Sequence, residues 1–125
     1  MTTPPKNETA ALQNLTVHPY SDLLIHHMGK NLADDITQGL ATGDMFRSTP
    51  LWGVGQRRFF LHDGRTDDLL KAIDAHYARA TDCDDDARGD RAPCYGPSEA
   101  NAVITRFKAL SPAEQQSILD FLRAL

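Results

Sequence analysis

The stretch from Arg47 to His76 constrains the fold of this 125-residue chain most, because it joins a glycine-rich loop to a helix through a tight turn. Gly53 and Gly55 allow the loop backbone to approach another group closely, since glycine has no Cβ. The turn follows at residues 62–64, where histidine, aspartate and glycine have the composition of a chain reversal. This arrangement is suited to holding a flat ligand against the loop.

The helix after this turn is predicted to run from Asp67 to about Arg79. Thr66 is a typical N-cap residue, and the two aspartates that follow it suit the positive end of a helix dipole. Apolar residues and one histidine recur at helical spacing on one side of the segment. The pattern predicts an inward-facing stripe formed by Leu69, Ile73 and His76.

Two further helices are predicted near the C-terminus. Ser98 is expected to cap a helix that ends near Leu110, with an inward face formed by Ala100, Val103, Ile104 and Phe107. Residues 111–114, Ser-Pro-Ala-Glu, then combine an N-cap, a proline in the first turn and a reciprocal glutamate, which predicts a third helix. Residues 17–29 are expected to form a short extended or turn-rich segment. Residues 30–46 contain no sustained periodicity and are expected to be loop with one helical turn.

These patterns predict one mainly α-helical domain. We assign residues 16–125 to that domain and residues 1–15 to a disordered or extended lead-in, which contains no export-signal pattern. The formal net charge is −4 without a basic stripe, which argues against a nucleic-acid partner. No segment resembles a membrane span. Nucleophile elbows, phosphate loops and metalloprotease patterns are absent from the sequence.

The two cysteines, Cys83 and Cys94, bracket a polar segment with the composition of a surface loop. In an oxidising compartment, a disulfide that closes such a loop would contribute about 3 kcal/mol of stability. In a reducing compartment the same residues would be free thiols. A zinc site is disfavoured, because neither cysteine belongs to a Cys-x-x-Cys pair and no histidine pair has ligand spacing.

His76 is the leading candidate for a metal ligand. Neutral imidazole is a good axial ligand for haem iron, and apolar neighbours on the helix would fix the ring and exclude water. The ordinary alternative is a half-buried histidine that bonds to the backbone. His62 is a second candidate for the same pocket, with Asp63 as its orienting partner, or else a turn residue that satisfies backbone groups. Met28 and Met45 rank below His76, because both lie in glycine-containing loops.

Arginines near the glycine-rich loop are candidates for binding the carboxylates of a porphyrin. Arg47, Arg57 and Arg58 have the side chain that pairs with carboxylates in a bidentate manner. The alternative is a solvated basic patch. The three other histidines are interpreted as surface or turn residues: His18, His26 and His27.

Four segments resemble the bacterial di-haem oxidoreductases that are related to di-haem cytochrome c peroxidases. They are VHPYSDLLIHHMG at residues 17–29, TPLWGVG at 49–55, FLHDGR at 60–65 and SEANAVITRFKALSPAEQQSILDFLRAL at 98–125. The likeness is to the C-terminal haem domain of that family. It extends in collinear order from about Leu15 to Leu125.

The resemblance implies a cytochrome c-like fold, haem c, electron transfer and a periplasmic location, which agrees with a disulfide between Cys83 and Cys94. In that family the helix after the His-Asp-Gly turn carries the distal axial ligand of the haem, and His76 is the matching residue. His62 matches a pocket residue. In related peroxidases the peroxide chemistry belongs to the other haem domain, so this chain alone is not expected to be catalytic. We expect the porphyrin to contact Arg47, through a propionate, and Leu51, Trp52 and Phe60, through apolar packing.

Two features depart from the family pattern. The haem-attachment motif Cys-x-x-Cys-His is absent from the 125 residues, so we expect a domain that is incomplete at its N-terminal side. Its partners would then be haem together with the upstream part of the same protein or another haem domain. Residues 77–96 also form a longer connection than is usual. The alternative to the haem domain is a small helical interaction module without haem, or a non-functional fragment, with an exposed apolar patch.

Overall fold

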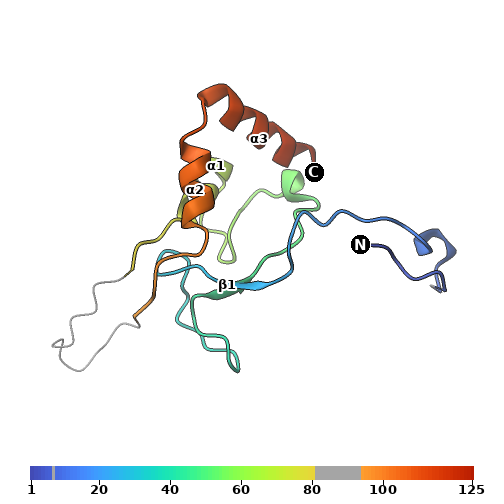
Figure 1. Ribbon diagram of the computed structural model, residues 1–125, viewed down its shortest axis with the longest axis horizontal. Coiled ribbons are helices and arrows are strands. Elements are labelled where there is room, and N and C mark those ends of the chain that lie inside the picture. Colours follow the sequence, from blue (N-terminus) through green and yellow to red (C-terminus); the bar gives the residue numbers. More distant parts are fainter. Residues whose placement is uncertain (7, 81–93) are drawn as a thin grey trace.

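The computed structural model describes residues 1–6, 8–80 and 94–125. It contains three α-helices, a two-stranded sheet and two short 3-10 helices (Figure 1). In chain order the elements are η1 (Ala10–Leu12), β1 (Ile25–His27), β2 (Met45–Arg47), η2 (Val54–Gln56), α1 (Leu69–Ala75), α2 (Asn101–Lys108) and α3 (Pro112–Ala124). The prediction of a mainly α-helical, cytochrome c-like domain is wrong, because the described chain combines three helices with a two-stranded antiparallel sheet, and its first half consists of this sheet, turns and extended segments.

The antiparallel sheet joins two segments that are 20 residues apart. Ile25 pairs with Arg47, His26 with Phe46 and His27 with Met45. Each strand has three residues, too few for an alternating pattern to identify in the sequence. The strand β2 is therefore specified by its partner, which explains why the sequence predicted only loop around residue 45.

Helix α1 is shorter than predicted and begins later. Its N-cap is Asp68, whose carboxylate accepts hydrogen bonds from the backbone N–H groups of Leu70 and Lys71. Thr66 instead belongs to the preceding turn, where its hydroxyl accepts from the N–H of Asp68. An aspartate at the N-cap satisfies two otherwise unpaired donors and suits the helix dipole.

The capping box predicted for α3 is confirmed. The Ser111 hydroxyl accepts from the N–H of Glu114, and the Glu114 carboxylate accepts from the N–H of Ser111 at 2.8 Å.

Helix α2 begins at Asn101, and its N-cap residue is Ala100. Ser98, which was predicted to be the N-cap, lies two residues before it. Ile104 and Phe107 are buried as predicted. The inward position predicted for Val103 is wrong, since 62% of it is exposed.

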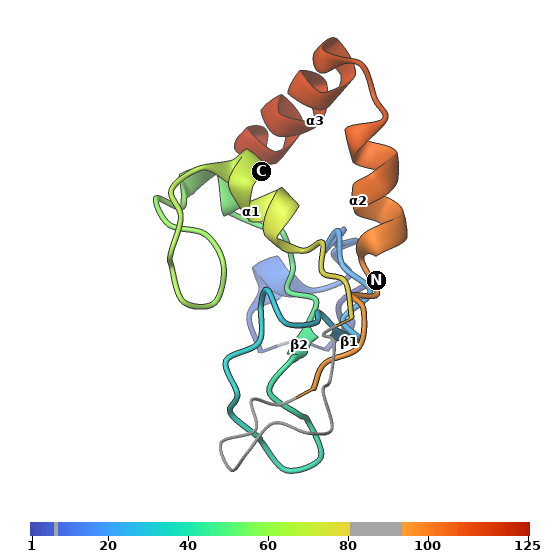
Figure 2. The ribbon, with the colours of Figure 1, turned by 90° about the vertical axis from the view of Figure 1, so that its left-hand side faces the viewer.

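Among the described residues, the buried apolar side chains come from all three helices and from the loops between the elements. They are Leu32, Ala72, Ala78, Tyr95, Ile104, Phe107 and Leu119. Helix α3 packs with its C-terminal end against η2, and the N–H of Gly53 donates to the carbonyl of Leu125 at 2.9 Å (Figure 2). This contact brings the glycine-rich loop and the last helix together.

The N-terminal segment extends away from the rest of the chain (Figure 1). Thr2 forms an isolated antiparallel bridge with Thr16, and η1 lies between them.

Cys94 is disulfide-bonded, whereas Cys83 lies outside the described residues. In the part of the chain that the structure describes, every helix is too short or too polar to cross a lipid bilayer.

Candidate functional site

A cavity of about 500 Å³ lies between the glycine-rich loop, the strand β2 and helix α1. Its walls are mostly apolar side chains from segments distant in sequence: Met28, Leu32, Phe46, Leu51, Val54, Phe60, Leu61, Leu69, Ile73 and Leu122. Four polar side chains with nitrogen atoms also line it: Arg47, Arg57, His62 and His76. Cavities that bind cofactors have volumes of about 300–1,000 Å³ and the same combination of apolar walls with a few placed polar groups.

His76 lies at the C-terminal end of α1, half-buried, on the side that faces the cavity. Its Nδ1 lies 2.8 Å from the carbonyl oxygen of Ala72, one helical turn earlier. A carbonyl can only accept a hydrogen bond, so Nδ1 carries the proton and Nε2 of the neutral ring has a free lone pair. Leu69 and Ile73 line the same cavity, as the predicted stripe requires.

The turn at residues 60–66 brings His62 to the cavity. The N–H of Phe60 donates to the carbonyl of Thr66 at 2.7 Å, and Leu61 adopts a left-handed conformation with a φ of 73°. A left-handed residue other than glycine is strained by about 1–2 kcal/mol. The exposed ring of His62 stacks on Phe46, with 4.6 Å between the ring centroids.

Asp63 does not orient His62 as the sequence analysis suggested. Its carboxylate accepts from the N–H of Arg65 at 3.2 Å and lies 3.5 Å from the guanidinium of the same residue. The turn is therefore closed by Asp63 and Arg65, and the contact that positions His62 is aromatic.

Five of the six predicted site residues line this one cavity: Arg47, Leu51, Phe60, His62 and His76. Trp52 does not line it. The Trp52 side chain is 53% exposed, and its indole N–H donates to the carbonyl of His18 at 2.8 Å. Gly53 follows with a φ of 70°, so the chain turns directly after the tryptophan. That turn accounts for the different environments of Leu51 and Trp52.

Sequence reasoning missed several walls of the cavity. Phe46 enters through the strand β2, and Leu122 comes from α3, whereas Leu32 belongs to a loop. No local pattern in the sequence marks Phe46, which reaches the cavity because β2 pairs with β1. Met28, which was weighed as a ligand, also lines the cavity. Met45 does not, and its sulfur accepts from the N–H of Thr42 at 3.3 Å.

A family model described as "Di-haem oxidoreductase, putative peroxidase" matches residues 4–125, which include every residue of the cavity. The chain belongs to the di-haem oxidoreductase family. No curated protein and no solved structure matches it. The family description implies haem as the cofactor.

The lining of the cavity in this di-haem oxidoreductase chain can be compared with what haem and a bare metal ion each need. Within the described ranges, no group of three or more His, Cys, Asp or Glu side chains is placed to hold a bare metal ion. A haem iron needs fewer protein donors, because the porphyrin supplies its four equatorial nitrogens. A single imidazole with a free Nε2, apolar walls and nearby guanidinium groups therefore fit haem better than a bare ion.

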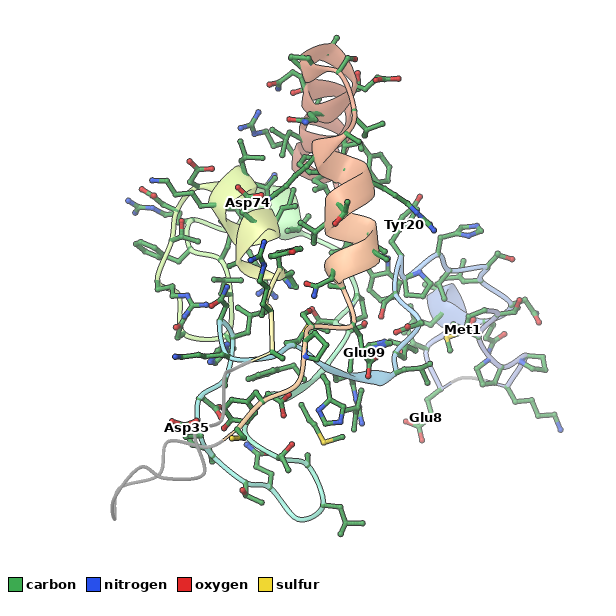
Figure 3. The ribbon with its side chains drawn as sticks, turned by 60° about the vertical axis from the view of Figure 1, so that its left-hand side comes forward. Met1, Glu8, Tyr20, Asp35, Asp74 and Glu99 are labelled. Carbon is green, nitrogen blue, oxygen red and sulfur yellow. The ribbon has the colours of Figure 1, made fainter. Side chains whose placement is uncertain are left out.

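A second polar group, which we call the His26 cluster, lies outside the cavity and consists of Asp22, His26 and Glu99. Nδ1 of His26 is 2.8 Å from the carboxylate of Glu99, and Nε2 is 2.7 Å from that of Asp22. Figure 3 shows Glu99 beside the strand β1. The cluster connects this strand to the start of α2, where the N–H of Glu99 also donates to the carbonyl of His27.

The His26 cluster should make stability depend on pH. Its hydrogen bonds, first with Glu99 and then with Asp22, raise the pKa of His26 above 6.5, and the bond with His26 lowers the pKa of Glu99 below 4.5. The His26 contribution is present below pH 6.5 and is lost as the pH rises through the raised pKa. The Glu99 contribution is present above pH 4.5 and is lost as the pH falls through the lowered pKa.

We therefore expect His26→Asn to lower the thermal midpoint most between pH 4.5 and 6.5, where both contributions are present. The difference from wild type should shrink as the pH rises further. Thermal unfolding followed by circular dichroism from about pH 5 to about pH 9 measures it. His18→Asn, the same change at an exposed histidine, is the control. A difference that stays constant over this range would contradict the assignment.

Proposed function

We propose that the cavity binds haem, with Nε2 of His76 as an axial ligand of the iron. The observation that carries the proposal is the hydrogen bond between Nδ1 of His76 and the carbonyl of Ala72. Histidines that bind metals almost always donate their other ring N–H to a carbonyl or carboxylate, which fixes the ring and makes the ligand more basic. Here that bond is made within α1, on the wall of an apolar cavity.

The other cavity residues have complementary roles in the proposal. Leu51 and Phe60 contribute apolar surface for the porphyrin, and the described structure gives no reason to include Trp52 among them. Arg47, at the end of β2, is assigned to a haem propionate. His62 remains a pocket residue, with its ring stacked on Phe46.

The chemistry that haem would supply is one-electron transfer. The contribution of the chain is to hold the imidazole of His76 in one tautomer and to exclude water from the ligand with apolar walls, two properties that set a redox potential. None of the described cavity residues is assigned a proton-transfer role, so we propose electron transfer within a larger di-haem protein rather than catalysis by this chain alone.

The compartment and the form of the cofactor belong to the same proposal. We propose haem c and a periplasmic location, and the bonded state of Cys94 supports an oxidising compartment. The 125 residues contain no Cys-x-x-Cys-His motif, which is the pattern that supplies the thioether bonds and the proximal histidine of haem c. The electron donor and acceptor are left unassigned.

A titration of the purified chain with ferric haem, followed by the visible spectrum, tests the proposal. We expect a shifted Soret band that saturates at one haem per chain, with weak affinity because the sequence has no Cys-x-x-Cys-His motif to supply thioether bonds and a proximal histidine. A haem spectrum that does not change in the presence of the chain would overturn the proposal.

We also expect Arg47→Gln to weaken haem binding slightly. Arg47 is exposed, and ion pairs at exposed positions contribute about 0.2–1 kcal/mol, which corresponds to at most about a fivefold change in affinity. The effect should diminish at high salt, since salt screens exposed charges. Haem titrations at two ionic strengths measure it, and Arg58→Gln is the control because Arg58 does not line the cavity. Equal effects of both substitutions would remove Arg47 from the site.

A further inference from the structure

The end of α1, where His76 lies, needs support from other segments. Helix α1 has only seven residues, and helices of that length are not stable in water without tertiary contacts. The backbone N–H of His76 still bonds to the carbonyl of Ile73 at 3.1 Å, so the histidine occupies the last turn. A last turn unwinds easily, and unwinding would break the bond between its ring and Ala72.

Asn101 supplies a two-point contact to the chain that leaves α1. Its side-chain oxygen accepts from the N–H of Ala78 at 3.0 Å, and its side-chain amide donates to the carbonyl of Ala78 at 2.8 Å. One side chain thus satisfies both backbone groups of a residue that is 2% exposed. Figure 2 shows the segment after α1 running beside the start of α2, where Asn101 is the first residue.

Two neighbouring contacts fix the same segment. Asn31 donates from its side chain to the carbonyl of Tyr77 at 2.7 Å, and the N–H of Ser98 donates to the carbonyl of Ala78 at 2.9 Å. The backbone at Gly29 approaches so closely that a Cβ there would lie 2.9 Å from the Cβ of Ala78. The two residues after His76 are therefore held by two segments, residues 29–31 and residues 98–101. Among the described residues, only Asn101 bonds to both backbone groups of Ala78 through its side chain.

We propose that Asn101 is a positioning residue for His76: by fixing Ala78 it keeps the last turn of α1 wound, so that Nδ1 of His76 stays on Ala72 and Nε2 stays free for the iron. This inference rests on the proposed function for its consequence in haem binding. The orientation of the His76 ring by the last turn of α1 does not depend on haem, so it can be tested in the chain without haem as well.

The test compares Asn101→Ala with Gln115→Ala. Gln115 is a matched control, because its side-chain amide also donates to backbone carbonyls, those of Phe107 and Leu110, but in the turn between α2 and α3. In the chain without haem, the ¹⁵N shifts of the imidazole report which ring nitrogen of His76 carries the proton. With haem added, affinity and the electron paramagnetic resonance spectrum of the ferric iron report the ligand.

In wild type and in Gln115→Ala we expect the Nδ1–H tautomer of His76 and the same ferric spectrum. In Asn101→Ala we expect the Nε2–H tautomer to gain population, the ferric spectrum to change and haem affinity to fall about tenfold, as for the loss of a residue that orients a ligand. If the alanine variant does not fold, Asn101→Asp replaces it. This variant keeps the acceptor for Ala78 and loses the donor, and the same changes are expected.

An unchanged tautomer in a folded Asn101 variant would overturn the positioning role, whatever haem does. Equal changes in Gln115→Ala would overturn it as well, because the effect would then be one of general stability. If the wild-type chain fails to bind haem while the tautomer still responds to Asn101, the proposed function fails and the positioning of the ring stands. The two proposals can thus be contradicted separately.

Discussion

Replacing His76 with alanine is expected to abolish haem binding to this chain. Loss of a residue that only orients a metal ligand lowers affinity by about 10–100-fold, and loss of the ligand itself should exceed this. The chain starts from weak binding, because it has no Cys-x-x-Cys-His motif to supply thioether bonds and a proximal histidine. Haem titrations of the wild type and of His76→Ala under identical conditions measure the difference.

Two alanine substitutions at other histidines make this result specific. His62 lines the same cavity but stacks on Phe46, so His62→Ala should weaken binding only slightly. His18 is exposed and does not line the cavity, so His18→Ala should leave affinity unchanged. Imidazole added to His76→Ala should restore part of the spectrum by occupying the vacated ligand position. Wild-type affinity in His76→Ala would remove His76 from the site.

The second large effect is expected from Gly55→Ala. Gly55 lies in η2 directly against the backbone of the last turn of α3, and a Cβ there would overlap the carbonyl oxygen of Arg123 and lie 2.6 Å from its carbonyl carbon. A backbone atom cannot rotate away as the end of a side chain can. The substitution must therefore push η2 and α3 apart, which loses the contact between Gly53 and Leu125.

We expect Gly55→Ala to lower the free energy of unfolding by about 1–3 kcal/mol, the usual cost of overpacking. Urea unfolding monitored by circular dichroism measures this change. Gly96→Ala is the control, because a Cβ at Gly96 meets no described atom within 4 Å and its φ is not left-handed. That substitution should be neutral or slightly stabilising, since alanine restricts the unfolded chain. Equal stability of both variants would contradict the close approach of η2 to α3.

Local patterns in the sequence predicted the features that depend on local chemistry. The capping box at Ser111 and Glu114 requires only four consecutive residues, and the structure confirms it. The stripe formed by Leu69, Ile73 and His76 depends on helical spacing alone, and all three residues line one cavity. These three residues share one side of the chain even though α1 begins two residues later than predicted and ends at Ala75.

Features that depend on distant partners were not predictable in the same way. Strand β2 exists because Met45, Phe46 and Arg47 pair with β1, and no local signal marks them. Trp52 was placed beside Leu51 at the porphyrin, but the left-handed turn at Gly53 and the bond to His18 hold its ring elsewhere. These choices are made by tertiary contacts, which a single sequence does not display.

The candidate haem site also combines a feature that the sequence predicts with one that only the tertiary structure shows. The family resemblance and the helical spacing selected His76, but neither specified which ring nitrogen is free. That information comes from the 2.8 Å contact between His76 and Ala72. The support for it comes from Asn101, which lies 25 residues after His76, in another helix. An asparagine that satisfies the backbone of a distant residue has no signature in sequence, because its partner is not a side chain.

The most direct test of the central claim is pulsed electron paramagnetic resonance of the ferric haem complex, prepared from the chain labelled with ¹⁵N only in histidine. The account predicts a coupling between the iron and an imidazole nitrogen in the wild type and in His62→Ala, and its loss in His76→Ala. A histidine coupling that persists in His76→Ala, or one that disappears only in His62→Ala, would contradict ligation of the iron by His76.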